Sequence, residues 1–181
     1  MKGMIFTEFL DMVSDRFGLA VKDRVIAAAG GAHDGAYTAV GKYDYREMVA
    51  MIGELNRATG IAVPALMNSF GEHVFQGFTR RYGHLFRETT SAITFLSHLE
   101  DYIHVEMRKL YPDAELPSFR YPPAAPGTLV MEYHSPRPMA AFAEGLVRAT
   151  IRYFGKPLSL SVEDLSAGQG TAARFTLGPS T

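Results

Sequence analysis

The chain has 181 residues, 47% of them apolar, which is enough for one domain or for two small lobes that share a core. Its formal net charge at pH 7 is −1 and it has no run of basic residues, which argues against a nucleic-acid or anionic-membrane partner. Because the sequence contains no cysteine, disulfides, thiolate catalysis and cysteine-ligated metal centres are excluded.

The first part of the chain predicts a series of amphipathic helices. Asp44, followed three residues later by Glu47, resembles a capping box and predicts a helix start. Glycines follow the apolar stripes, as is typical of helix ends. The acids within the first apolar stretch are unlike a signal peptide, and no apolar run reaches bilayer length, so we expect a cytoplasmic protein. The predicted elements are helices over residues 1–17, 21–29 and 45–59, closed by Gly18, Gly30 and Gly60, and a loop with one extended piece over residues 32–43.

A fourth helix is predicted over residues 64–78. Pro64 suits the first helical position, since it has no amide hydrogen to leave unpaired. Gly71 and Gly77 cost the helix about 1 kcal/mol each relative to alanine. They mark either a close approach of another backbone or ligand, or a helix that simply tolerates the two glycines. A linker is expected over residues 80–88. One apolar stripe runs along this helix: Leu66, Phe70, Val74 and Phe78.

The next stretch predicts one long helix with a histidine inside it, His104. Ser91 or Thr90 can cap its start, and Pro112 ends it. On the residues alone, two interpretations of His104 stay open: a core histidine satisfied by the backbone or by neighbours such as Glu100, and a metal or haem ligand. The residues expected to face a core are Ile93, Leu96, Leu99, Ile103, Met107 and Leu110.

The remainder of the chain differs in composition. Proline-rich residues 112–127 predict an extended connection. Beyond it the pattern predicts a strand, an amphipathic helix closed by a glycine, and a hairpin, which together form a small antiparallel sheet with a helix against it. The fold class is therefore α+β. The predicted elements are strands over residues 128–135, 158–166 and 171–177, and a helix over residues 138–154.

Three polar residues stand at the end of the first of these strands: Tyr133, Ser135 and Arg137. Side chains two positions apart in an extended chain point to the same side. An arginine fork and two hydroxyls form a donor cluster for a carboxylate. Alone the motif is a weak signal, and without further evidence the favoured interpretation is an exposed strand end with ordinary polar residues.

Together, His104 and the Tyr-x-Ser-x-Arg motif resemble the haem-nitric-oxide/oxygen-binding (H-NOX) family, which also supplies the haem domain of soluble guanylate cyclase. The resemblance covers essentially the whole chain, from MKGMIFTEFL through LEDYIHVEMRKLYPDAELPSF and MEYHSPRPM to the closing strands. It implies a single domain of residues 1–181 with a haem b buried between a helical subdomain (1–112) and a sheet subdomain (128–181), joined by residues 113–127.

The resemblance also implies roles for individual residues. His104 would be the only protein ligand of a ferrous haem iron, and Tyr133, Ser135 and Arg137 would hold the propionates. Ile5 and Pro117 match the positions that press on the haem and bend it in this family. Phe78 and Leu146 are also expected to contact the cofactor.

The face of the haem opposite His104 is expected to select the gas. Family members that hold oxygen carry a tyrosine at the position of Phe142, and the positions of their supporting polar groups are here Phe9 and Val74. Bound oxygen needs a hydrogen-bond donor, whereas nitric oxide and carbon monoxide do not. The resemblance therefore implies a sensor of nitric oxide that also binds carbon monoxide. His73 lies near this region and is expected to serve between helices or toward solvent.

The expected sensor is not an enzyme and signals in trans, to a histidine kinase or to a diguanylate cyclase or phosphodiesterase. Some bacterial relatives carry a Cys/His zinc site near the C-terminus, but the matching residues 161–175 contain neither residue type. Alternatives are an oxygen-binding haem protein, a haem enzyme of the peroxidase or nitric oxide dioxygenase type, and a haem-free module that binds a carboxylate ligand.

Overall fold

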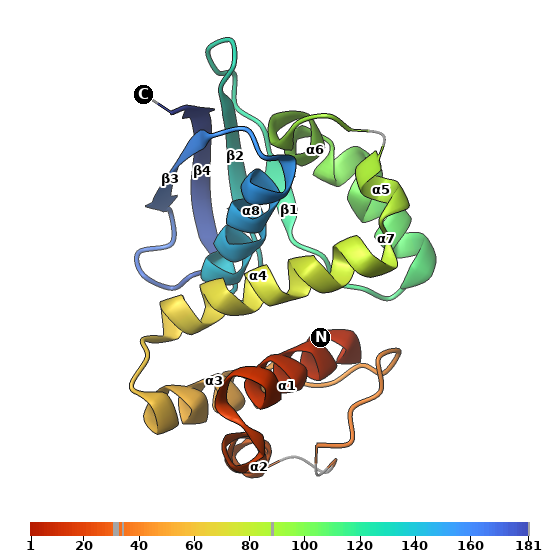
Figure 1. The fold of residues 1–181 in the computed structure, drawn as a ribbon, viewed down its shortest axis with the longest axis vertical. Coiled ribbons are helices and arrows are strands. Elements are labelled where there is room, and N and C mark those ends of the chain that lie inside the picture. The colour runs from red at the N-terminus through yellow and green to blue at the C-terminus, as the bar shows by residue number, and fades with distance from the viewer. Residues whose placement is uncertain (31–32, 34, 88, 181) are drawn as a thin grey trace.

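A computed structural model describes residues 1–30, 33, 35–87 and 89–180 (Figure 1). Within these residues, no helix has both the length and the apolar content needed to cross a membrane. The elements are α1 (Gly3–Phe17), α2 (Leu19–Ala29), α3 (Tyr45–Thr59), α4 (Val63–Arg81), α5 (His84–Arg87), α6 (Ala92–Ser97), the π-helix η1 (Leu99–Ile103), α7 (His104–Leu110), β1 (Ser118–Arg120), β2 (Leu129–His134), α8 (Ala140–Phe154), β3 (Leu158–Asp164) and β4 (Ala172–Pro179).

Helices α1, α2 and α3 form a lobe below α4 in Figure 1. The helix ends predicted at Gly18, Gly30 and Gly60 are confirmed. Asp44 caps α3, although its side chain accepts the amide hydrogen of Arg46 and not that of Glu47. The Glu47 carboxylate instead accepts a hydrogen bond of 2.7 Å from the Tyr37 hydroxyl, so it ties the preceding loop to the helix.

The loop predicted over residues 32–43 lies partly outside the described residues, which omit 31, 32 and 34. Its final part runs beside the start of α1. Lys42 forms an isolated antiparallel bridge with Lys2, and the N-terminal amino group of Met1 donates to the carbonyl of Tyr43 at 2.7 Å. The beginning of the chain is therefore fixed against this loop.

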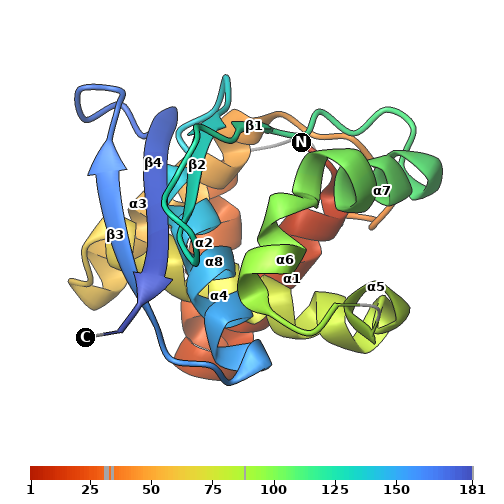
Figure 2. The same cartoon turned by 90° about the horizontal axis from the view of Figure 1, so that it is seen from above.

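The four strands form one antiparallel sheet in the order β1-β2-β4-β3, with α8 against one face. Both views place α8 between the sheet and α5 to α7 (Figure 2). The strands predicted as β2, β3 and β4 and the helix predicted as α8 are confirmed. Strand β1 was not predicted, because its three residues lie within the proline-rich connection. Its Phe119 pairs with Tyr133 of β2.

Helices α4 and α8 pack closely because glycines face each other where they cross. A β-carbon at Gly71 would stand 2.2 Å from the carbonyl oxygen of Phe142, and one at Gly145 would stand 2.1 Å from that of Asn68. Neither position has room for a larger residue without movement of the neighbouring backbone. Of the two interpretations left open for Gly71, the close approach of another backbone is the right one.

The long helix predicted around His104 is interrupted. Ser91 caps α6, as predicted, but α6 ends at Ser97 and the chain continues as the π-helix η1 before α7. In η1 the amide of Ile103 donates to the carbonyl of His98, which gives the wider i→i+5 turn that often marks functional sites. Leu110, the last residue of α7, is 53% exposed, so it does not face the core as expected.

The buried side chains form two clusters. One joins α1, α2, α3 and the first part of α4. The other joins the end of α4, helices α5 to α7, the sheet and α8. Phe78, Met139 and Leu146 pack against both clusters, so the two halves of the core meet at these residues.

Candidate functional site

A largely apolar cavity lies between the two core clusters, and most of the predicted site residues line it. Its wall comes from α1, α4, α5, α6, η1, α7, β1, β2 and α8, so segments far apart in the sequence contribute to one site. The cavity brings together Ile5, Phe78, His104, Pro117, Tyr133, Ser135, Arg137, Phe142 and Leu146.

Phe9 and Val74 do not line this cavity. Both are fully buried in the core cluster of α1 to α4. The ring of Phe9 lies 5.2 Å from that of Phe70, which in turn lies 5.0 Å from that of Phe142. Phe9 therefore supports the wall from one layer behind, through Phe70.

His104 stands at the first position of α7 and is only 8% exposed. Burial lowers the pKa of its imidazole, which favours the neutral form that a metal ligand requires. Its Nδ1 atom is buried and makes no hydrogen bond with any described residue, although Oε1 of Glu100 lies 3.4 Å away. The imidazole is therefore buried, with the Glu100 carboxylate beside its Nδ1 atom.

The motif residues reach the cavity from two places: strand β2 and the turn after it. In β2 alternate residues are buried, so Tyr133 points inward and burial raises the pKa of its phenol. The strand ends at His134, and Ser135 and Arg137 lie in the turn that follows. There the backbone amide of Arg137 donates to Oγ of Ser135 at 3.1 Å, which fixes the turn.

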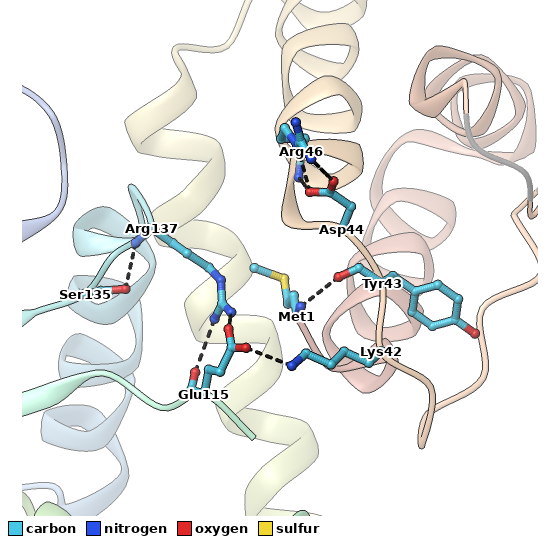
Figure 3. A network of polar contacts seen from close by, with 8 residues as sticks. All are labelled: Met1, Lys42, Tyr43, Asp44, Arg46, Glu115, Ser135 and Arg137. Carbon is cyan, nitrogen blue, oxygen red and sulfur yellow. Dashed lines mark hydrogen bonds and ion pairs between the residues drawn. The ribbon is translucent and has the colours of Figure 1, made fainter. Parts of the chain in front are cut away.

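The guanidinium of Arg137 is held by Glu115 in this structure (Figure 3). It donates to the backbone carbonyl of Glu115 at 3.2 Å and forms an ion pair with its carboxylate. The same carboxylate pairs with Nζ of Lys42 at 2.8 Å. The arrangement shows that Arg137 can present its fork to a carboxylate at the cavity, and it joins the N-terminal loop to the segment after α7.

Other polar groups that line the cavity are already paired. The Tyr82 and Tyr111 hydroxyls lie 3.0 Å apart, and Tyr111 donates onward to the sulfur of Met4. Burial, and then this hydrogen bond, raises the pKa of Tyr82 to about 12. The Thr150 hydroxyl donates to the carbonyl of Leu146 at 2.8 Å. The hydroxyl hydrogens of these residues are therefore committed within the protein.

His73 lies between helices, as expected. Its Nε2 is 3.5 Å from Oε2 of Glu8, a buried carboxylate of α1 that also pairs with Arg81 at 2.6 Å. His73 is not among the residues that line the cavity. Glu8, His73 and Arg81 therefore join α1 to α4 away from the cavity.

Several residues of the cavity were not predicted from the sequence: Lys42, Tyr82, Tyr111 and Glu115. Tyr82 directly follows α4 and Tyr111 directly follows α7, and nothing in their spacing predicts the contact. Glu115 lies two residues before Pro117, and only the path of the chain after α7 brings it to Arg137.

The residues present fit a haem. A haem is an apolar disc with two carboxylates on one edge, and it needs an apolar slot, a neutral imidazole and a cationic fork. The cavity supplies an apolar wall, the buried imidazole of His104, and Arg137 beside Ser135 and Tyr133. No group of three or more His, Cys, Asp or Glu side chains suited to a bare metal ion occurs among the described residues.

Comparison with protein families decides the identification. A family model described as haem-NO-binding matches residues 2–162. The chain belongs to the haem-NO-binding, or H-NOX, family. Members of this family are haem-binding gas sensors.

Solved H-NOX structures share the fold. The Fe(II) unliganded protein from K. algicida is 35% identical, with a TM-score of 0.94 over 100% of this chain and 97% of that one. The IWP-051-bound protein from Shewanella woodyi in the Fe(II)CO state is 30% identical, with a TM-score of 0.83 over 99% and 95% of the two chains. A protein from S. oneidensis in the Fe(II)NO state is 21% identical, with a TM-score of 0.90 over 100% of both chains. The predicted family and α+β fold class are thus confirmed. A comparison with curated proteins finds no match.

Proposed function

We propose that this H-NOX chain is a sensor of nitric oxide that also binds carbon monoxide, with a ferrous haem b held by His104. The observation that carries the proposal is the buried imidazole of His104 in an apolar cavity that also receives Tyr133, Ser135 and Arg137. The description of the family as haem-NO-binding supports the choice of gas. The 30% identical S. woodyi protein, whose structure holds Fe(II) and carbon monoxide, supports the second ligand.

Each group of residues has a distinct task in this proposal. When bound, the haem supplies a ferrous iron that takes a diatomic gas. His104 supplies the protein's bond to the metal, while Arg137, Ser135 and Tyr133 orient the carboxylate edge by charge-assisted and neutral hydrogen bonds. Ile5, Phe78, Phe142 and Leu146 exclude water from the apolar slot.

The polarity of the cavity favours nitric oxide over oxygen. Bound oxygen carries partial negative charge and is stabilised by a hydrogen-bond donor. Phe142 offers none, and the hydroxyl hydrogens of Tyr82, Tyr111 and Thr150 are committed within the protein. We therefore expect weak oxygen binding.

The sensor must convert binding into a change of shape. Ile5 belongs to the lobe of α1 to α3, whereas His104, Pro117 and Tyr133 belong to the half that contains the sheet. A ligand held by both halves can shift one against the other, which is the two-state element that a sensor requires. We propose a histidine kinase or a diguanylate cyclase or phosphodiesterase as the partner in trans; the family resemblance alone supports this choice.

The test is the visible absorption spectrum of the anaerobically reduced protein, recorded alone, in air, and with nitric oxide or carbon monoxide. We expect a five-coordinate ferrous haem spectrum that air does not convert to an oxygen complex and that each of the other two gases changes. A protein that takes up no haem, or one that forms a stable oxygen complex in air, would contradict the proposal.

A further inference from the structure

Glu100 is held in place beside His104 by a strand that the sequence did not reveal. The backbone amide of Phe119 in β1 donates to Oε1 of Glu100 at 2.7 Å. Arg108 approaches the second carboxylate oxygen at 3.9 Å. The Phe119 ring lies 5.8 Å from the imidazole of His104 and 5.7 Å from the ring of Tyr133. Strand β1 therefore fixes both the carboxylate and one side of the imidazole.

The buried nitrogen of His104 faces this carboxylate. Nδ1 is removed from solvent and has no hydrogen bond within the described part of the chain, while Oε1 of Glu100 lies 3.4 Å from it. A buried polar hydrogen without an acceptor costs about 1–3 kcal/mol. A histidine that binds a metal through one ring nitrogen usually donates the hydrogen of the other to a carboxylate, a carbonyl or water.

We propose that Glu100 is a positioning residue for His104: its carboxylate, anchored by the Phe119 amide, accepts the Nδ1 hydrogen and leaves Nε2 as the metal ligand. The inference rests on the proposed function, because it assumes that His104 binds the iron. It adds a residue that sets the tautomer, the orientation and the electron donation of that ligand.

The chemical consequence is a stronger bond between His104 and the metal. A carboxylate that accepts from Nδ1 gives the imidazole partial anionic character, which strengthens its donation to iron and stabilises the ferric state. If binding of nitric oxide weakens this bond, Glu100 would set how readily the bond breaks.

The test compares haem-loaded wild-type protein with Glu100→Gln and Glu100→Leu. Glutamine keeps the size and an acceptor for the Phe119 amide but removes the charge, whereas leucine removes the acceptor altogether. Glu106→Gln is the matched control, since Glu106 lies on α7 and its carboxylate pairs with Lys109 at 2.5 Å. The readouts are the iron–histidine stretching frequency of the ferrous protein by resonance Raman, the haem midpoint potential, and the electron paramagnetic resonance spectrum with nitric oxide.

We expect both Glu100 variants to lower the stretching frequency, raise the midpoint potential and increase the share of nitric-oxide-bound protein that has lost its bond to His104. We expect the control to match wild type. Wild-type frequency and potential in Glu100→Gln would overturn the inference, even if Glu100→Leu fails to fold. If wild-type protein shows no iron–histidine band, or a band that survives His104→Gly, the proposed function fails and the inference fails with it.

Discussion

Phe142 forms part of the cavity wall, with its ring 5.0 Å from that of Phe70. Replacing it with tyrosine should add a hydroxyl donor at a place in the wall where Phe142 offers none. One hydrogen bond to a partly charged acceptor is worth about 1.5 kcal/mol, so we expect Phe142→Tyr to raise oxygen affinity about tenfold. The measurement is oxygen titration of the reduced protein followed by absorption.

Phe154→Tyr provides the control for this prediction, because Phe154 lies on the same helix but is not among the cavity-lining residues. It should leave oxygen affinity unchanged. Equal oxygen affinity in wild type and Phe142→Tyr would show that Phe142 does not face the bound gas.

At this scale, the sequence predicted the residues whose chemistry is unusual for their position. His104 inside a helix and the Tyr133, Ser135, Arg137 motif stand out without a structure. Glu115, the partner of Arg137, does not stand out in the sequence. Glu115 reaches Arg137 through the path of the chain after α7, and a residue pair 22 positions apart leaves no periodic pattern.

The contact between α4 and α8 depends on two glycines. A β-carbon at Gly71 would stand 2.2 Å from the carbonyl oxygen of Phe142, so Gly71→Ala requires the helices to separate. We expect a loss of about 1–3 kcal/mol in the free energy of unfolding, measured by urea denaturation. Since the same displacement moves Phe142, the affinity for gases should change as well.

Gly53→Ala in α3 is the matched control. A β-carbon there would meet no atom within 4 Å, and alanine favours a helix interior by about 0.5–1 kcal/mol. This variant should be slightly more stable than wild type. If Gly71→Ala were equally stabilised, the close packing of α4 on α8 would be wrong.

The segment between α7 and β1 is joined to the N-terminal loop by Glu115. Lys42 first, and then Arg137, lower the pKa of its carboxyl below the ordinary value of 4.5; the amino group of Met1 is a further positive charge nearby. A lowered folded-state pKa contributes stability that is present above the pKa of the unfolded chain and is lost as the pH falls through the folded-state pKa. The melting temperature of wild type should therefore exceed that of Glu115→Gln at neutral pH.

This difference in melting temperature should shrink as the pH falls from 4.5 through the lowered folded-state pKa of Glu115, below which both chains carry an uncharged side chain at position 115. The difference should also shrink in high salt, because the Glu115–Lys42 ion pair is exposed and salt screens exposed charges. A difference that stays constant from neutral to acid pH would show that the ion pairs do not stabilise the fold.

Among the elements, those with their own boundary signals were predicted correctly. Helix α3 begins directly after its cap, Asp44, and ends before Gly60, and α8 ends before Gly155. Strand β1 was missed because three residues are too few for a period, and its pairing with β2 is a long-range contact. The π-helical turn was missed because the residues 99–103 carry the same apolar spacing as an α-helix.

At the scale of the whole molecule, the two core clusters meet at α4 and the first half of α8, and the cavity lies where they meet. The predicted division into residues 1–112, 113–127 and 128–181 stays a prediction. Helices α5 to α7 pack with the sheet and α8. These helices, which line the site around His104, therefore belong to the C-terminal core, although they precede the proline-rich connection in the sequence. Sequence composition marks that connection, but only tertiary packing shows which core a helix joins.

The central claim is that His104 supplies the one bond from the protein to the haem iron. The most direct measurement is the absorption spectrum of reduced His104→Gly, with and without added imidazole, beside wild type. We predict that the variant loses the five-coordinate ferrous spectrum and that imidazole, which fills the space of the missing side chain, restores both the spectrum and its change with nitric oxide. A variant that keeps the wild-type spectrum without imidazole would contradict the claim.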